Sequence, residues 1–148
     1  MATYTQILYH IVFSTKNRIN CLKSEKCDDL YRYIWGIIKN KNCYLYRING
    51  AENHIHILTS LHPTISLSEF VKDIKVASTI WIKDNKTFQY FDGWQNGYAA
   101  FTYSIKEKQN VINYIKNQQK HHKKKTFKEE LKELLMEMGI KYEEKYLE

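Results

Sequence analysis

The segment CYLYRINGAENHIHILTSL, residues 43–61, contains two β-forming runs that flank a short polar stretch. Alternating apolar, aromatic and β-branched positions predict strands over residues 43–48 and 54–61. The residues between them, NGAE at 49–52, are typical of a tight turn, so we expect the two strands to form an antiparallel hairpin. The hairpin is the local unit around which the rest of the fold is predicted.

Two histidines, His54 and His56, lie one residue apart in the second strand of this hairpin. Strand side chains alternate between the two faces, so both imidazoles share one face, and Ile55 and Ile57 share the other. We expect the isoleucines to pack on a core and the imidazoles to stand on the wetter face. Two imidazoles side by side on a stiff strand suit a divalent metal, but two ligands do not complete a site, and ordinary surface histidines are the alternative.

Outside the hairpin, the chain predicts two more strands and four helices. The strands are expected at residues 9–15 and 98–104. The helices are expected at residues 25–41, with Ser24 as the cap, and at 66–83, 106–122 and 127–138. The order β-α-β-β-α-β-α-α is a split βαβ arrangement. We therefore expect an α+β fold: one ferredoxin-like domain over residues 1–148, with an antiparallel sheet, helices on one face, the other face open, and additional C-terminal helices.

Composition and charge narrow the function classes. The chain of 148 residues is 43% hydrophobic, which favours one folded domain over disorder, and its apolar runs are too short to cross a bilayer. Three cysteines without paired spacing argue against a disulfide framework and for a reducing cytosol. Residues 126–148 hold four Lys and seven Glu, a net charge of −3. Because the whole chain has a net charge of +7, residues 1–125 carry +10. Such a basic body suits nucleic acid, although a solvated lysine-rich surface explains it equally well.

The helix predicted over residues 106–122 offers a third ligand and a nucleophile. Tyr114 and Gln118 are four residues apart and therefore share a helix face. A glutamine amide oxygen can bind Mg²⁺ or Mn²⁺ beside imidazole, and a tyrosine one turn away can attack a phosphodiester that the cation polarises. Because the chain has twelve tyrosines, an ordinary core or surface role is the alternative for any one of them.

Five segments in this order together resemble the single-tyrosine HUH transposases of the insertion-sequence 200/605 type. That group includes transposase-like proteins associated with repetitive extragenic palindromes. The segments are HIVFSTKNR at His10–Arg18, NHIHIL at Asn53–Leu58, Ile74-Lys75 to Ser78, Trp94 to Gly97-Tyr98, and Tyr114-Ile115-x-x-Gln118. The histidine pair alone is a common pattern, whereas the ordered set spans nearly the whole chain.

The resemblance implies a specific reaction. It implies that His54, His56 and Gln118 bind Mg²⁺ or Mn²⁺, and that Tyr114 cleaves single-stranded DNA to leave a 5′-phosphotyrosine and a free 3′-hydroxyl. Rejoining would then exchange strands without external energy. The resemblance also implies single-stranded DNA with hairpin ends as the partner, and a homodimer whose composite active sites let the tyrosine helix serve either subunit. It implies a cytoplasmic prokaryotic protein, bound to no membrane and associated with the nucleoid when active.

Several expectations concern surfaces outside this motif set. The residues expected to contact DNA are Lys16, Asn17, Arg18, Lys72 and Lys75. The aromatic loop at 88–94 is expected either to stack on unpaired bases or to be buried under a helix. His121 and His122 are expected to lie on a surface near DNA, and the alternative is that they act as metal ligands or proton carriers. The acidic helix over 127–138 has no catalytic motif and is expected to pack on the body or a partner.

Two other functions share these features. A non-catalytic RNA-binding module has the same element order, with aromatic side chains on an exposed sheet as base-stacking platforms. A domesticated relative that processes chromosomal hairpins would have the same active-site residues. His54 and His56 stand where the RNA-binding module would carry aromatics on a central strand, which disfavours that module. The sequence does not separate the domesticated relative from a mobile-element enzyme.

Overall fold

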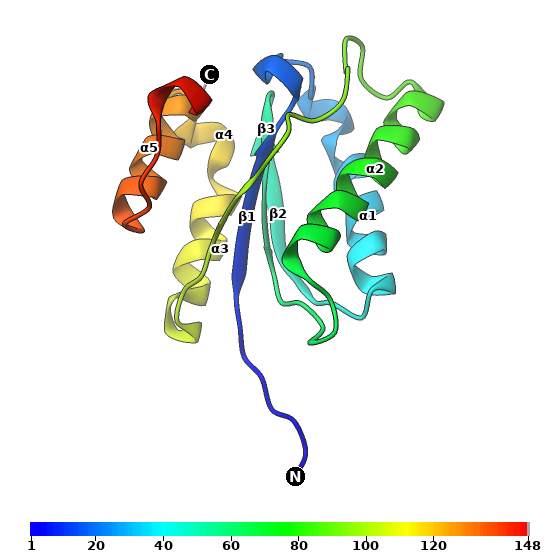
Figure 1. The fold of residues 1–148 in the computed structure, drawn as a ribbon. Helices are drawn as coiled ribbons and strands as arrows, with labels where there is room; N and C mark the ends of the chain where they lie inside the picture. The colour runs from blue at the N-terminus through cyan, green and yellow to red at the C-terminus, as the bar shows by residue number, and fades with distance from the viewer. Residues whose placement is uncertain (148) are drawn as a thin grey trace.

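The computed structural model describes residues 1–147 and arranges them in three layers, with a sheet between two groups of helices (Figure 1). The four strands are β1 (Tyr9–Ser14), β2 (Leu45–Ala51), β3 (His54–Thr59) and β4 (Ala99–Phe101). They pair antiparallel in the order β2-β3-β1-β4, which confirms the predicted split βαβ fold. No helix among residues 1–147 is both long and apolar enough to span a membrane.

The helices fall into two groups on opposite faces of the sheet (Figure 1). One face is covered by α1 (Ser24–Asn40) and α2 (Leu67–Asn85). The other is covered by α3 (Lys108–Lys116), α4 (Gln118–His121) and α5 (Phe127–Glu137). Short 3-10 turns occupy Lys16–Arg18, Ile105–Glu107 and Glu144–Leu147. The Ser66 side chain accepts from the Glu69 N–H at the start of α2, whereas Ser24 is the first residue of α1 and not its cap.

The hairpin turn lies later than its sequence predicts. β2 continues through Asn49, Gly50 and Ala51, and only residues 52–53 turn before β3 begins. Gly50 serves a close approach and not a turn, because a Cβ there would lie 2.2 Å from the His54 carbonyl oxygen. The Asn-Gly pair is a strong local turn signal, but here tertiary contacts use both residues within the ladder.

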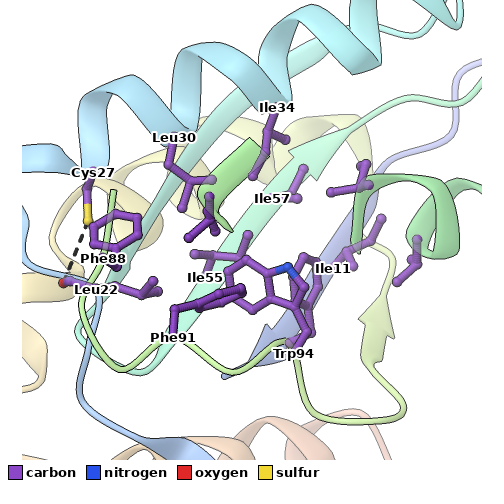
Figure 2. Close-up of a cluster of buried hydrophobic side chains, with 14 of the residues drawn as sticks. Ile11, Leu22, Cys27, Leu30, Ile34, Ile55, Ile57, Phe88, Phe91 and Trp94 are labelled. Carbon is purple, nitrogen blue, oxygen red and sulfur yellow. Dashed lines mark hydrogen bonds between the residues drawn. The ribbon is translucent and has the colours of Figure 1, made fainter. Parts of the chain in front are cut away.

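The core between the sheet and α1 and α2 is formed by the apolar sides of all these elements (Figure 2). It contains Ile11, Phe13, Ile55 and Ile57 from the strands, Leu30, Ile34 and Ile38 from α1, and Phe70 and Ile74 from α2. Phe88, Phe91 and Trp94 of the aromatic loop are also buried in it, and the Trp94 indole N–H donates to Ser78 Oγ. These three rings are therefore core residues, which leaves Tyr90, 75% exposed, as the accessible aromatic of this loop.

The second sheet face, expected to be open, is covered. Val12 and Leu58 on this face are at most 1% exposed and pack with buried side chains of the C-terminal helices. The covering side chains are Val111 and Ile115 of α3 and Phe127, Leu134 and Leu135 of α5. An RNA-recognition module needs exposed aromatics on this face, so its coverage removes the surface on which that alternative depends.

The region predicted as one helix over 106–122 consists of a 3-10 turn followed by α3 and α4, with Asn117 outside helical geometry (φ −97°, ψ 19°). The Asn49 side chain of β2 explains the interruption. Its Nδ2 donates to the carbonyl oxygens of Ile115 and Lys116, both at 3.0 Å. Because helix ends leave carbonyl groups without partners, a donor held on the sheet stabilises the end of α3 at this point.

Candidate active site

His54 and His56 are both fully buried, at 0% exposure, and not on a wetter face as their polarity suggests. His54 Nδ1 lies 2.8 Å from Asn53 Oδ1, and His56 Nδ1 lies 2.8 Å from Nε2 of His10. His10 in turn contacts the Tyr103 hydroxyl at 3.2 Å. Because a partner occupies Nδ1 of each ring of the pair, both Nε2 atoms are directed to one point between β3 and the C-terminal helices.

Tyr114 and Gln118 meet the histidine pair from above the sheet, despite the break between α3 and α4. The fully buried Gln118 places Oε1 3.2 Å from His54 Nε2. The Tyr114 ring lies edge-on to His56, with 5.8 Å between ring centroids. The structure therefore brings together, within one chain, the four residues that the sequence nominates as ligands and nucleophile.

Glu130 of α5 is the residue that sequence reasoning missed. Its carboxylate is 1% exposed, and Oε1 lies 3.1 Å from His56 Nε2 and 2.9 Å from His122 Nε2. Its Oε2 accepts from Gln118 Nε2 at 2.9 Å and from the Tyr114 hydroxyl. The acidic helix predicted to lack a catalytic role thus sends a carboxylate into the centre of the site.

A weak signal for Glu130 exists in the sequence. It lies three residues after Phe127 and four before Leu134, so it occupies the buried, apolar stripe of α5. His10 has a similar signal, since strand alternation and the pairing of β1 with β3 place it on the same sheet face as the histidine pair. Neither signal identifies a role without knowledge of which helix covers this face.

The electrostatics of the cluster follow from burial and from the single carboxylate. Burial lowers the pKa of His54 to about 4, and the nearby His56 adds to this, so the imidazole is neutral at pH 7. Burial raises the pKa of Tyr114, and Glu130 raises it further, so the phenol keeps its proton. Burial by itself raises the pKa of the Glu130 carboxyl, but hydrogen bonds from the histidines outweigh it and hold the pKa well below its usual range.

The donor set fits a divalent cation. Neutral imidazole nitrogen, amide oxygen and carboxylate oxygen are ligands that suit Mn²⁺, and the oxygens suit Mg²⁺. One ligand atom from each of His54, His122 and Glu130 lies within 4.8 Å of the others, and Gln118 Oε1 approaches the same His54 nitrogen. His122 is therefore part of the cluster, whereas His121, whose Nε2 lies 3.5 Å from Glu130 Oε2, stands at its edge.

The residues expected to contact DNA separate into two groups. The Lys16–Arg18 turn lies near the site, because the Arg18 guanidinium is 5.0 Å from the Phe127 ring and that ring stacks on His54. Lys16 pairs with Asp92 at 3.6 Å, and the Asn17 N–H donates to Gln95 Oε1. The second group, Lys72 and Lys75, belongs to α2 on the opposite side of the sheet (Figure 1).

Within that second group, Lys72 is exposed, whereas Lys75 is half-buried. Lys75 Nζ donates to the carbonyl oxygens of Gln95 and Gly97, so it fastens the approach to β4. A cleft of about 500 Å³ adjoins the site instead, between the start of α1, the β2–β3 turn and the segment before α5. Its lining includes Asn53, His122, Phe127 and the lysines Lys123 and Lys125.

Comparison with known proteins agrees with this geometry. The family described as Transposase IS200 like matches residues 3–118. The transposase for insertion sequence element IS200 of Salmonella typhimurium is 28% identical over 115 residues, which cover 74% of this chain and 75% of the relative.

Two solved structures share the fold. A candidate transposase from Deinococcus radiodurans R1 has a TM-score of 0.61 at 24% identity, covering 80% of this chain and 95% of its own. A REP-associated tyrosine transposase bound to a REP hairpin has a TM-score of 0.60 at 16% identity, covering 82% of this chain and 74% of its own. The family match takes in both histidines, the tyrosine and the glutamine, and ends at Gln118, before α5 begins. This chain belongs to the IS200-like transposase family.

Proposed function

We propose that this protein cleaves and rejoins single-stranded DNA through Tyr114, beside a Mg²⁺ or Mn²⁺ ion held by His54, His56 and Gln118. The observation that carries the proposal is the meeting of these side chains in one chain. Gln118 Oε1 approaches His54 Nε2 at 3.2 Å, and Tyr114 packs against His56 and shares the Glu130 carboxylate with it.

The proposed reaction balances without an outside reagent. The Tyr114 oxygen forms a bond to phosphorus while the bond from phosphorus to the 3′-oxygen breaks, and the phenolic proton is finally carried by the released 3′-hydroxyl. The tyrosine ester preserves the energy of the broken bond, so attack by a 3′-hydroxyl reverses the step and rejoins strands. A bound divalent cation would neutralise charge on the phosphate oxygens.

The protein's own contribution is to hold these groups in place. Asn53 and His10 fix the two imidazoles with Nε2 toward the site, and Asn49 fixes the junction that carries Gln118. In the described state the Tyr114 hydroxyl donates to the Glu130 carboxylate. Positioning of this kind supplies much of the rate gained when a reaction becomes effectively intramolecular.

We further propose single-stranded DNA with hairpin ends as the partner, in the cytoplasm at the nucleoid. The basic body of residues 1–125, Arg18 beside the site and Lys123 and Lys125 along the adjoining cleft support this partner. Lys16, Asn17, Lys72 and Lys75 are kept as candidate DNA contacts.

The covalent step is tested with full-length protein, Mn²⁺ and single-stranded oligonucleotides that carry any hairpin-forming sequence found beside the gene. We expect wild-type protein to form a protein–DNA adduct that persists on a denaturing gel. Tyr114→Phe should abolish the adduct, and Tyr44→Phe, at a position 63% exposed, should leave it intact. Adduct formation by Tyr114→Phe at the wild-type level would refute the proposal.

We propose that the protein is a homodimer, as the family resemblance implies. A separate test asks whether Tyr114 acts at the histidines of its own subunit or at those of the partner. A mixture of His54→Ala and Tyr114→Phe subunits forms the adduct only if a tyrosine serves the partner's histidines. The convergence of Tyr114 on its own chain's site supports service within one subunit. Restored cleavage in the mixture would instead demand composite sites.

A further inference from the structure

We propose that Glu130 is itself a ligand of the divalent cation, together with His54 and His122, so that α5 forms part of the metal centre. This inference rests on the proposed function, because it concerns the same cation. It adds two ligands that the matched family segment, residues 3–118, does not contain. The consequence is that cation binding connects the C-terminal helix to β3.

The position of Glu130 in α5 is the first reason. Phe127, Glu130 and Leu134 form the buried stripe of this helix, so a carboxylate occupies a place where an apolar side chain is expected. Burying an unpaired carboxylate costs several kcal/mol, and buried charges are therefore paired or bound to metals. Among residues 1–147, the ion-pair partners that the structure shows for Glu130 are histidines, which are themselves metal ligands in their neutral form.

The spacing of the atoms is the second reason. Glu130 Oε1 lies 2.9 Å from His122 Nε2, 3.1 Å from His56 Nε2 and 3.4 Å from His54 Nε2. Two ligand atoms that bind one ion at about 2.1 Å in tetrahedral or octahedral geometry lie about 3.0–3.4 Å apart. Two of the three observed separations lie in this range and the third is 0.1 Å below it, so ligation needs only small side-chain movements.

The support of α5 is the third reason, because it holds Glu130 in place. A capping box joins Thr126 and Glu129 at the start of the helix. The Phe127 ring stacks on the His54 imidazole with 4.2 Å between centroids, and Leu134 and Leu135 pack in the core with Val12. Ligands held by packing and by such secondary contacts are the ones that bind a metal without a large ordering cost.

The competing interpretation is that Glu130 occupies the site in place of a cation. The two interpretations predict opposite effects of removing its charge. A ligand strengthens cation binding, so its loss weakens the affinity, whereas a competitor's loss strengthens it. The measurement therefore needs only the cation and not the DNA.

The experiment measures Mn²⁺ binding to the full-length protein by calorimetry and electron paramagnetic resonance, without DNA. Glu130→Gln should weaken the affinity at least about tenfold, since even partners behind the ligands alter it by 10- to 100-fold. Glu133→Gln, on the exposed side of the same helix and paired with Lys125, is the matched control and should bind as wild type. Unchanged or tighter binding by Glu130→Gln would overturn the inference.

A second variant and a second measurement guard against misfolding. Glu130→Asp keeps the carboxylate but shortens its reach, so we expect affinity between those of wild type and Glu130→Gln. Mn²⁺ should slow amide hydrogen exchange of residues 127–137 in wild type and not in Glu130→Gln, and equal slowing in both would also contradict the inference. His54→Ala separates the two proposals: if it binds Mn²⁺ as wild type does, the metal site of the proposed function fails, whereas unaffected Glu130 variants alone refute only this inference.

Discussion

Replacement of Gly50 by alanine tests the close approach of β2 and β3 behind the histidine pair. An added Cβ would lie 2.2 Å from the His54 carbonyl oxygen and 2.9 Å from Ile55 Cα. Both atoms belong to the backbone of a central strand, so no side-chain rotation relieves the contact. To reach even 3.0 Å from the carbonyl oxygen, the two strands have to separate locally by about 0.8 Å.

The cost follows from this separation. Overpacking of a core position costs about 1–3 kcal/mol and occasionally more. Because the obstacle is paired backbone on both sides, we expect Gly50→Ala to lie at the upper end, about 3 kcal/mol, out of a total stability of about 5–15 kcal/mol. The same displacement moves His54, so we also expect weaker Mn²⁺ binding in the folded fraction.

The assay is urea unfolding followed by circular dichroism, with Gly36→Ala as the control. Gly36 lies inside α1, and a Cβ there meets nothing within 4 Å, so this variant should gain about 0.5–1 kcal/mol. The expected result for Gly50→Ala is a lower midpoint with an unchanged slope. A loss below about 0.5 kcal/mol, the usual size of a surface effect, would refute the steric reasoning.

Four further predictions concern the supports of the site and the cation. Ser78→Ala leaves the buried Trp94 N–H without its acceptor and should cost about 1–3 kcal/mol, with altered tryptophan fluorescence; wild-type stability would show that the bond contributes nothing. Thr126→Ala removes the capping box of α5 and should cost about 1 kcal/mol, with faster amide exchange at the start of that helix, and unchanged exchange would contradict it. Asn49→Leu, which keeps the branched side chain and its number of heavy atoms, deprives the end of α3 of its donor and should cost about 1–3 kcal/mol by urea unfolding; a neutral result would mean that water replaces the amide. Mn²⁺ at one hundred times its Kd should stabilise the wild-type protein by about 2.7 kcal/mol, reversibly with a chelator, and no shift would count against the metal site.

Local patterns predicted the order of elements and several side-chain positions. Alternation in β3 correctly placed Ile55 and Ile57 in the core and His54 and His56 together on the other face. Helical spacing likewise placed Tyr114 and Gln118 on one face, and both side chains donate to the Glu130 carboxylate. These features depend on residues within a few positions of each other, so their periodicity is visible in the chain itself.

The interrupted tyrosine helix could not be predicted in the same way. No glycine or proline interrupts residues 106–122. The donor that satisfies the carbonyls before Asn117 belongs to Asn49, on another element. The local turn signal at Asn49 and Gly50 failed for the same reason, since both residues are used in contacts across the sheet. In both places, contacts with residues distant in the sequence overrode the secondary structure that the local pattern predicts.

The sequence by itself determined the fold class, the shared face of His54 and His56, and the spacing of Tyr114 and Gln118, because each follows from the 2- or 3.6-residue period of one element. Only the tertiary structure decided that the histidine face is buried and that Glu130 enters it. The contact from His56 to Glu130 joins residues 74 positions apart, in adjacent layers of the molecule. No periodicity within either element encodes such a meeting. It arises because the second face of the sheet must be covered, and the helix that covers it carries a carboxylate in its apolar stripe.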